Sequence, residues 1–128
     1  MTTKILIVDD YLDTLSIYRE LFEMQGYEVL TATSGDEAAL HMQDAMPELL
    51  IVDDDPQEES GVRVVARLKR IAMERTRRSV PAIAIRGDFY RGDPPVMLGF
   101  EYVLGKPLGF ERLGHIVRHA SGGMMNMA

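Results

Sequence analysis

The chain has 128 residues, which is enough for one domain with a hydrophobic core and too few for two. Its formal net charge of −6 at pH 7 argues against a nucleic-acid-binding surface, because phosphate contacts need a basic face, and the absence of cysteine excludes disulfides, zinc–thiolate sites and thiol chemistry. Since no signal peptide is recognisable and no apolar run is long enough to cross a membrane, we expect a soluble protein of the cytoplasm.

The first predicted elements are a strand at residues 4–8 and a helix at residues 12–25. The strand is a short apolar run, and two carboxylates, Asp9 and Asp10, follow it directly. In the helix, apolar residues recur at helical spacing with charged residues on the other face, and Gly26 is a natural helix stop. The pattern indicates a buried strand with acids at its carboxyl end, followed by an amphipathic helix.

A second strand at residues 27–32 leads through a turn into a second helix at residues 36–45. Ser34 is a suitable N-cap for this helix, and Glu37, three residues later, completes a capping box. The cap predicts where the helix begins relative to the strand before it.

The stretch from residue 47 to residue 55 combines a buried strand with a cluster of acids. Its four consecutive apolar residues, 49–52, are too few for an amphipathic helix and are typical of a strand covered on both faces in a parallel sheet. Asp53, Asp54 and Asp55 follow at once. Like charges at the end of a buried strand repel unless they are solvated or bind a cation, and open α/β sheets bind ligands at the carboxyl ends of their strands. We therefore interpret Asp53 as a site residue.

The second half of the chain continues the alternation of strands and helices. We predict a helix from residue 61 to about residue 73, a solvated basic connection at residues 74–79, and a strand at residues 81–85 that ends at Arg86. Gly and Pro residues between residues 88 and 95 exclude a long helix there.

At most a short helix at residues 95–99 is therefore expected before the fifth strand, at residues 101–104. Lys106 and Pro107 follow that strand, and a last helix at residues 108–120 contains two glycines that weaken it. We assign residues 1–120 to one domain and residues 121–128 to a flexible tail.

Strands that alternate with helices at this spacing predict an α/β fold, a doubly wound five-stranded parallel sheet of the flavodoxin-like (βα)5 type with a short or irregular fourth helix. In that strand order the first and third strands are neighbours. The acids that follow these two strands would then meet in one crevice: Asp9, Asp10 and Asp53.

Carboxylates gathered at strand ends require a divalent cation, and oxygen ligands fit Mg²⁺. We do not expect histidine ligands, because none of the three histidines has metal-ligand spacing with the acids, and we interpret all three as surface residues: His41, His115 and His119. With Mg²⁺ beside it, Asp53 would be a suitable nucleophile for phosphoryl transfer and would form an aspartyl phosphate. Lys106, after the fifth strand, would neutralise the phosphoryl oxygens as a point charge.

Several short motifs of the chain occur in a fixed order and spacing: residues 5–10, 26–29, 34–39 and 47–53, then Gly61 and the pair Lys106-Pro107. Each motif is weak alone, but together they are highly specific. Through them the sequence resembles the receiver domain of two-component response regulators along nearly its whole length.

The resemblance implies that Asp53 accepts a phosphoryl group from a histidine kinase or a histidine phosphotransfer protein. It implies a set of Mg²⁺ ligands: Asp10 and Asp53 through their side chains, Asp55 through its backbone carbonyl and Asp9 through water. Lys106 would contact the phosphoryl group, and the peptide bond before Pro107 would be cis, a geometry found almost only before proline.

Two of the departures from the family pattern lie at the last two predicted strands. Arg86 stands at the end of the fourth strand, where receivers usually carry a Thr or Ser that hydrogen-bonds the phosphoryl group. Val103 stands three residues before Lys106, where a Tyr or Phe usually changes rotamer on phosphorylation. We consider two roles for Arg86, a salt bridge to Asp53 that keeps the site closed and a ligand of the phosphoryl group.

The leading hypothesis is a stand-alone receiver domain. We expect it to signal through protein contact, since no output domain follows residue 120, and not to act as an enzyme on external substrates. An alternative is a binding module of the same fold that works without phosphorylation, which Arg86 and Val103 favour. A less favoured alternative is a small phosphatase of the haloacid-dehalogenase type that uses Asp53 and Asp55 as an Asp-x-Asp motif.

Overall fold

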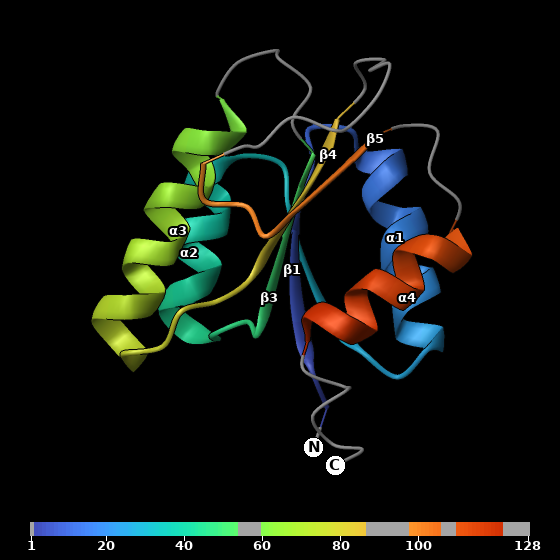
Figure 1. Ribbon diagram of the computed structural model, residues 1–128, viewed down its shortest axis with the longest axis horizontal. Helices are drawn as coiled ribbons and strands as arrows, with labels where there is room; N and C mark the ends of the chain where they lie inside the picture. The colour runs from blue at the N-terminus through green and yellow to red at the C-terminus, as the bar shows by residue number, and fades with distance from the viewer. Residues whose placement is uncertain (1, 54–59, 87–97, 106–109, 122–128) are drawn as a thin grey trace.

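Five parallel strands form the middle layer of the structure, in the order β2-β1-β3-β4-β5. The computed structural model describes residues 2–53, 60–86, 98–105 and 110–121. The strands are β1 (Lys4–Val8), β2 (Glu28–Ala32), β3 (Leu49–Asp53), β4 (Ala82–Arg86) and β5 (Tyr102–Gly105). Helices α2 (Gly35–Asp44) and α3 (Gly61–Thr76) cover one face of the sheet, and α1 (Leu12–Met24) and α4 (Phe110–Ala120) cover the other (Figure 1). The predicted doubly wound sheet of the flavodoxin-like type is therefore confirmed.

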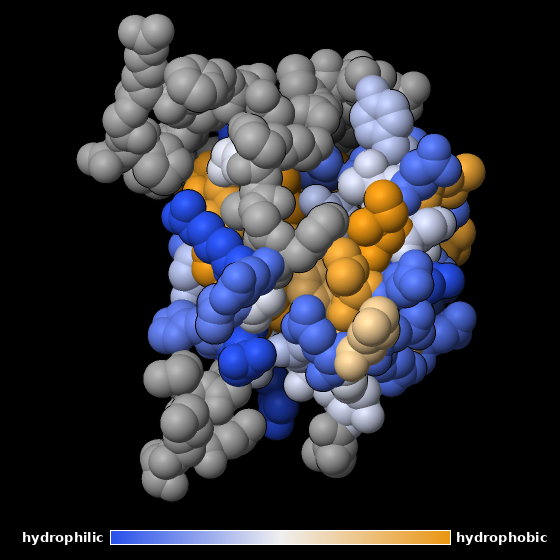
Figure 2. All heavy atoms as spheres, turned by 90° about the vertical axis from the view of Figure 1, so that its right-hand side faces the viewer, coloured by the Kyte–Doolittle hydropathy of each residue, from blue (hydrophilic) through white to orange (hydrophobic). Residues whose placement is uncertain are grey.

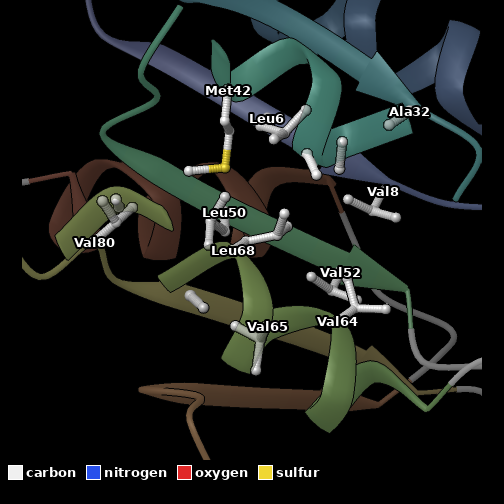
Figure 3. Packing of buried hydrophobic residues seen from close by; sticks show 14 residues of the cluster. Leu6, Val8, Ala32, Met42, Leu50, Val52, Val64, Val65, Leu68 and Val80 are labelled. Atoms are coloured by element: carbon white, nitrogen blue, oxygen red, sulfur yellow. The ribbon is translucent and has the colours of Figure 1, made fainter. Parts of the chain in front are cut away.

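The core has two halves, one on each face of the sheet. Leu6 and Leu50, which pair across β1 and β3, pack with Leu68 of α3 on one face (Figure 3). Their neighbours Ile7 and Ile51 belong to the cluster on the opposite face, beneath α1 and α4. Successive side chains of a strand point to opposite faces, so strands covered on both sides need apolar residues at every position. This explains the uninterrupted apolar runs of β1 and β3.

The ends of α1 and α2 agree with the sequence prediction to within one residue. Gly26, just after α1, has φ = +96°, a backbone conformation that glycine adopts without strain. Ser34 Oγ accepts the N–H of Glu37 at 3.1 Å, as a helix N-cap should. The Glu37 carboxylate accepts the N–H of Thr33 at 2.8 Å. The second hydrogen bond of the predicted capping box is therefore made with the residue before the N-cap and not with Ser34 itself.

Helix α3 continues to Thr76, and the predicted connection at residues 74–79 was therefore wrong in its first half. The last turn is stabilised by a contact that the sequence does not reveal, because the Arg75 guanidinium donates to the Met42 carbonyl at the end of α2, at 2.6 Å. A cation near the C-terminus of a helix is also favoured by the helix dipole. The helix ends at Arg77, which has a left-handed backbone conformation with φ = 62°.

The segment that precedes β5 packs closely against α3. Leu98 and Gly99 form a turn, so the helix predicted at residues 95–99 is not formed there, and residues 95–97 lie outside the described part of the chain. Gly99 has φ = +90°, and a Cβ at this position would lie 2.9 Å from Cγ1 of Val65 in α3. Phe100 packs against the cluster beneath α2 and α3.

Glu101 connects α3 to both β4 and β5. Its carboxylate accepts the Lys69 ammonium at 2.8 and 2.9 Å and the backbone N–H of Ala82 at 2.7 Å. Glu101 makes these contacts from the position just before the strand, and β5 starts at Tyr102, one residue later than predicted.

Helix α4 begins at Phe110, and the predicted start at residue 108 lies outside the described residues. Of the predicted tail at residues 121–128, the structure describes only Ser121. His115 and His119 are exposed as predicted, but His41 is half-buried, with Nε2 2.9 Å from the Thr31 carbonyl oxygen. The surface assignment of His41 was therefore wrong. Over the described ranges, no helix combines the length and the apolar character needed to cross a membrane.

Candidate functional site

The carboxyl ends of β1 and β3 lie side by side. Val8 pairs with Val52 in the parallel register, so Asp9 and Asp53 are the next residues on two adjacent strands. Both strands end at the upper end of the sheet in Figure 1. The predicted meeting of these acids in one crevice therefore agrees with the observed strand register.

The three acids differ in their exposure to solvent. Asp9 is 1% exposed, and its Oδ1 accepts the backbone N–H of Tyr11 at 2.9 Å. Asp53 is half-buried as a residue, but both of its carboxylate oxygens are buried, whereas Asp10 is exposed. Removing a carboxylate from water costs several kcal/mol unless cations and hydrogen-bond donors compensate. Two buried carboxylates on neighbouring strands therefore create a site that attracts positive charge.

A pocket of about 80 Å³ opens beside these acids. This volume is several times what one water molecule needs, so the pocket has room for a hydrated ion. The residues around it come from β1, β3 and the beginnings of α2 and α3: Val8, Asp9, Asp10, Thr33, Ser34, Gly35, Val52, Asp53, Gly61 and Val64.

The residues that begin α2 and α3 were not predicted as part of the site. Ser34 was interpreted only as a helix cap, and Thr33 and Gly35 were not singled out. The order of the strands could have indicated these residues. Because β2 pairs with β1 in parallel, the turn after Ala32 lies at the same edge of the sheet as Asp9. The Asp9 N–H donates to the Ala32 carbonyl at 3.0 Å, which fixes the two segments together.

The donors of this pocket fit Mg²⁺ better than a softer metal. All are oxygens, and Mg²⁺ commonly takes one or two protein carboxylates and keeps several waters. Within the described ranges, no three acidic or histidine side chains lie close enough together to form a protein-only metal cage. An Mg²⁺ ion in this pocket would therefore be held by no more than two of these carboxylates together with water, which is how Mg²⁺ is commonly bound.

The other predicted site positions lie at β4 and β5 or outside the described residues. Arg86 is the last residue of β4 and follows Ile85, the register partner of Asp53. Val103 lies in β5, where it pairs with Ala84. The remaining predicted positions are outside the part of the chain that the structure describes: Asp55, Lys106 and the cis-proline candidate Pro107.

Comparisons with known proteins agree with this geometry. The polar-differentiation response regulator DivK of Brucella ovis is 29% identical over 124 residues, which cover 95% of this chain and 98% of that protein. The fold is similar to that of the receiver domain (CheY-like) from Methylobacillus flagellatus, with a TM-score of 0.77, 24% identity and coverage of 94% of this chain and 99% of that chain. Chemotaxis protein CheY4 of Vibrio cholerae has a TM-score of 0.78 at the same identity and coverage. Residues 5–118 match the response regulator receiver domain as a family, so the chain belongs to the response regulator receiver domains of two-component signalling.

Proposed function

We propose that Asp53 is a phosphoacceptor and that this receiver domain takes a phosphoryl group from a histidine kinase or a histidine phosphotransfer protein in the presence of Mg²⁺. The observation that supports this most is the position of Asp53, whose buried carboxylate borders the pocket beside Asp9 at the joined ends of β1 and β3. A nucleophilic carboxylate next to a metal-ready pocket is the arrangement that phosphoryl transfer requires.

In the proposed transfer, a carboxylate oxygen of Asp53 attacks the phosphorus of a phosphohistidine. An O–P bond forms while the N–P bond of the donor breaks, and the electron pair of that bond stays on the imidazole nitrogen. Later attack by water on the phosphorus returns the carboxylate and releases inorganic phosphate. Strand β3 holds the nucleophile in place throughout, because its backbone pairs on both sides with β1 and β4.

The residues that would hold Mg²⁺ are the acids of the pocket, with Asp10 and Asp53 as direct ligands and Asp9 acting through water. Mg²⁺, when bound, supplies charge neutralisation at the phosphoryl oxygens. We extend this proposal to the backbone carbonyl of Asp55 and to a contact between Lys106 and the phosphoryl group.

We propose that the output is contact with another protein in the cytoplasm. The net charge of −6 argues against a nucleic-acid partner. The chemistry of the site acts on Asp53 itself, so we expect no turnover of an external phosphate ester. The haloacid-dehalogenase alternative depended only on Asp53 and Asp55, whereas the family match spans residues 5–118.

The test is the intact mass of the protein after incubation with acetyl phosphate and Mg²⁺. We expect a gain of one phosphoryl group in the wild-type protein and none in Asp53→Asn. Asp54→Asn removes the neighbouring acid with the same change of charge and should still gain the group. A wild-type protein without a mass gain, or an Asp53→Asn protein that still gains one, would refute the assignment of Asp53.

A second candidate function is a receiver-like binding module that does not need phosphorylation. Arg86 and Val103 favour it, since neither side chain can perform the hydroxyl and aromatic roles usual at these positions. This candidate predicts that Asp53→Asn binds the partner as well as the wild-type protein does, whereas the phosphoacceptor proposal predicts a dependence on acetyl phosphate. A pull-down with each protein, with and without acetyl phosphate, separates the two.

A further inference from the structure

Arg86 brings a positive charge to the strand edge that carries Asp53. Strand β4 lies next to β3, and Asp53 pairs with Ile85, the residue directly before Arg86. Arg86 is half-buried and its Nε is fully buried. An arginine that extended freely into solvent would expose Nε, so the base of this guanidinium lies against the end of the sheet.

Three other described cations have partners elsewhere in the fold. Lys4 lies at the amino end of β1, with its ammonium 4.0 Å from Glu28. Lys69 binds Glu101. Arg75, in the last turn of α3, donates to the carbonyl of Met42. None of these three is placed at the carboxyl edge of β3, whereas β4 places Arg86 there.

Arg86 belongs to the strand on the other side of β3 from β1, and it does not line the pocket. The walls of the pocket come from β1, β3 and the beginnings of α2 and α3, and the strand order puts β4 on the other flank of β3. Arg86 is therefore placed to act on an ion in the pocket through its charge, across Asp53, without occupying the pocket.

We propose that Arg86 is a built-in counter-ion of Asp53 that weakens Mg²⁺ binding in the pocket. This inference rests on the proposed function, which places Mg²⁺ between Asp10 and Asp53. The three acids carry three negative charges, and one guanidinium at the neighbouring strand end offsets one of them before any metal arrives. A Thr or Ser at this position would offset none. Arg86 thus raises the Mg²⁺ concentration at which half of the sites are occupied.

The expected effect follows from strand spacing. Neighbouring strands are about 4.8 Å apart, so an ion at the junction of β1 and β3 would lie roughly 8 Å from a guanidinium at the end of β4. At about 8 Å, repulsion between a divalent ion and one guanidinium changes Kd about sixfold with the dielectric constant of water, and more in a less polar surrounding. At low ionic strength, where screening by salt is weak, neutralising Arg86 should therefore tighten Mg²⁺ binding about sixfold.

The experiment measures Mg²⁺ affinity by isothermal titration calorimetry in the full chain without phosphoryl donor. Arg86→Gln and Arg86→Thr both remove the charge, so the comparison survives if one of them fails to fold. Arg86→Lys keeps the charge. Arg118→Gln is the matched control, because Arg118 is exposed in the last turn of α4, away from the residues that line the pocket, and its loss changes the net charge by the same amount. Amide shifts of Gly35 and Gly61, which line the pocket, report whether Mg²⁺ binds there.

We expect tighter binding in Arg86→Gln and Arg86→Thr, and affinities close to wild type in Arg86→Lys and Arg118→Gln. Equal affinities in the wild-type protein and both neutral variants would overturn the inference, as would an equal gain in Arg118→Gln, which would indicate an effect of net charge alone. Absence of Mg²⁺ binding in every variant would overturn it too. Failure of the proposed function is seen separately, as absence of the phosphoryl mass gain in the wild-type protein at saturating Mg²⁺.

Discussion

Replacement of Gly99 by alanine should destabilise the protein more than the same change at Gly26, although both glycines have nearly the same φ. The two values are +90° and +96°, so each alanine adopts an unfavourable backbone conformation that costs about 1–2 kcal/mol. The new methyl group at residue 26 would meet no atom within 4 Å, whereas at residue 99 it would lie 2.9 Å from Cγ1 of Val65. Val65 is fully buried in α3, so it has little freedom to move away.

The contact with Val65 adds a term for overpacking, which is typically about 1–3 kcal/mol. We therefore expect Gly99→Ala to lower the free energy of unfolding by about 2–5 kcal/mol and Gly26→Ala by only about 1–2 kcal/mol. Urea unfolding followed by circular dichroism measures both values, provided that the m-value stays constant.

A double-mutant cycle isolates the clash. Val65→Ala removes Cγ1, so the alanine at residue 99 should cost less in that background, with a coupling of about 0.5–3 kcal/mol. Equal losses for Gly99→Ala and Gly26→Ala, together with no coupling between residues 99 and 65, would refute the close packing of this segment against α3.

Three further substitutions test the core, a helix cap and a helix interior by the same urea experiment. Leu68→Ala should lower the free energy of unfolding by about 2–5 kcal/mol, because Leu68 is fully buried in α3, and a loss below 1 kcal/mol would contradict its place in the core. Ser34→Ala should lower it by about 1 kcal/mol, since the N–H of Glu37 loses its acceptor, and Ser34→Asp should retain most of the stability. Gly114→Ala should raise it by about 0.5–1 kcal/mol, because glycine is unfavourable inside a helix and the new methyl would meet only the flexible end of Gln25, at 3.4 Å. A destabilised Gly114→Ala protein would show that Gln25 cannot yield.

The parts of the fold that the sequence predicted well are those decided by local pattern. Four apolar residues in a row followed by Asp53 define a buried strand with an acid at its end, whatever packs around it. The cap at Ser34 is equally local. The C-terminus of α3 is not, because its last turn depends on Arg75 reaching the carbonyl of Met42, which lies 33 positions earlier in the chain.

The same division applies to the site. The meeting of Asp9 and Asp53 could be predicted because the order of strands in a doubly wound sheet makes the first and third strands neighbours. The contribution of Thr33 and Gly35 to the pocket could not, because it depends on how far α2 begins beyond the end of β2 and at what angle it leaves the sheet. For Arg86, sequence alone left two roles, and the strand order adds that it lies across β3 from the pocket.

The strand order also has a consequence for how the chain acquires its site during folding. Strand β1 lies between β2 and β3, and Ile5 pairs with Leu49, 44 positions later in the sequence. Such distant pairings form late and slowly, because a long loop must close, at a cost in chain entropy, before the contacts between the strands can stabilise it. A folding intermediate in which only β1, α1 and β2 have assembled would contain Asp9 and Asp10 but would lack Asp53 beside them. Mg²⁺ would therefore bind only after β3 has docked, and its addition should slow unfolding rather than speed folding.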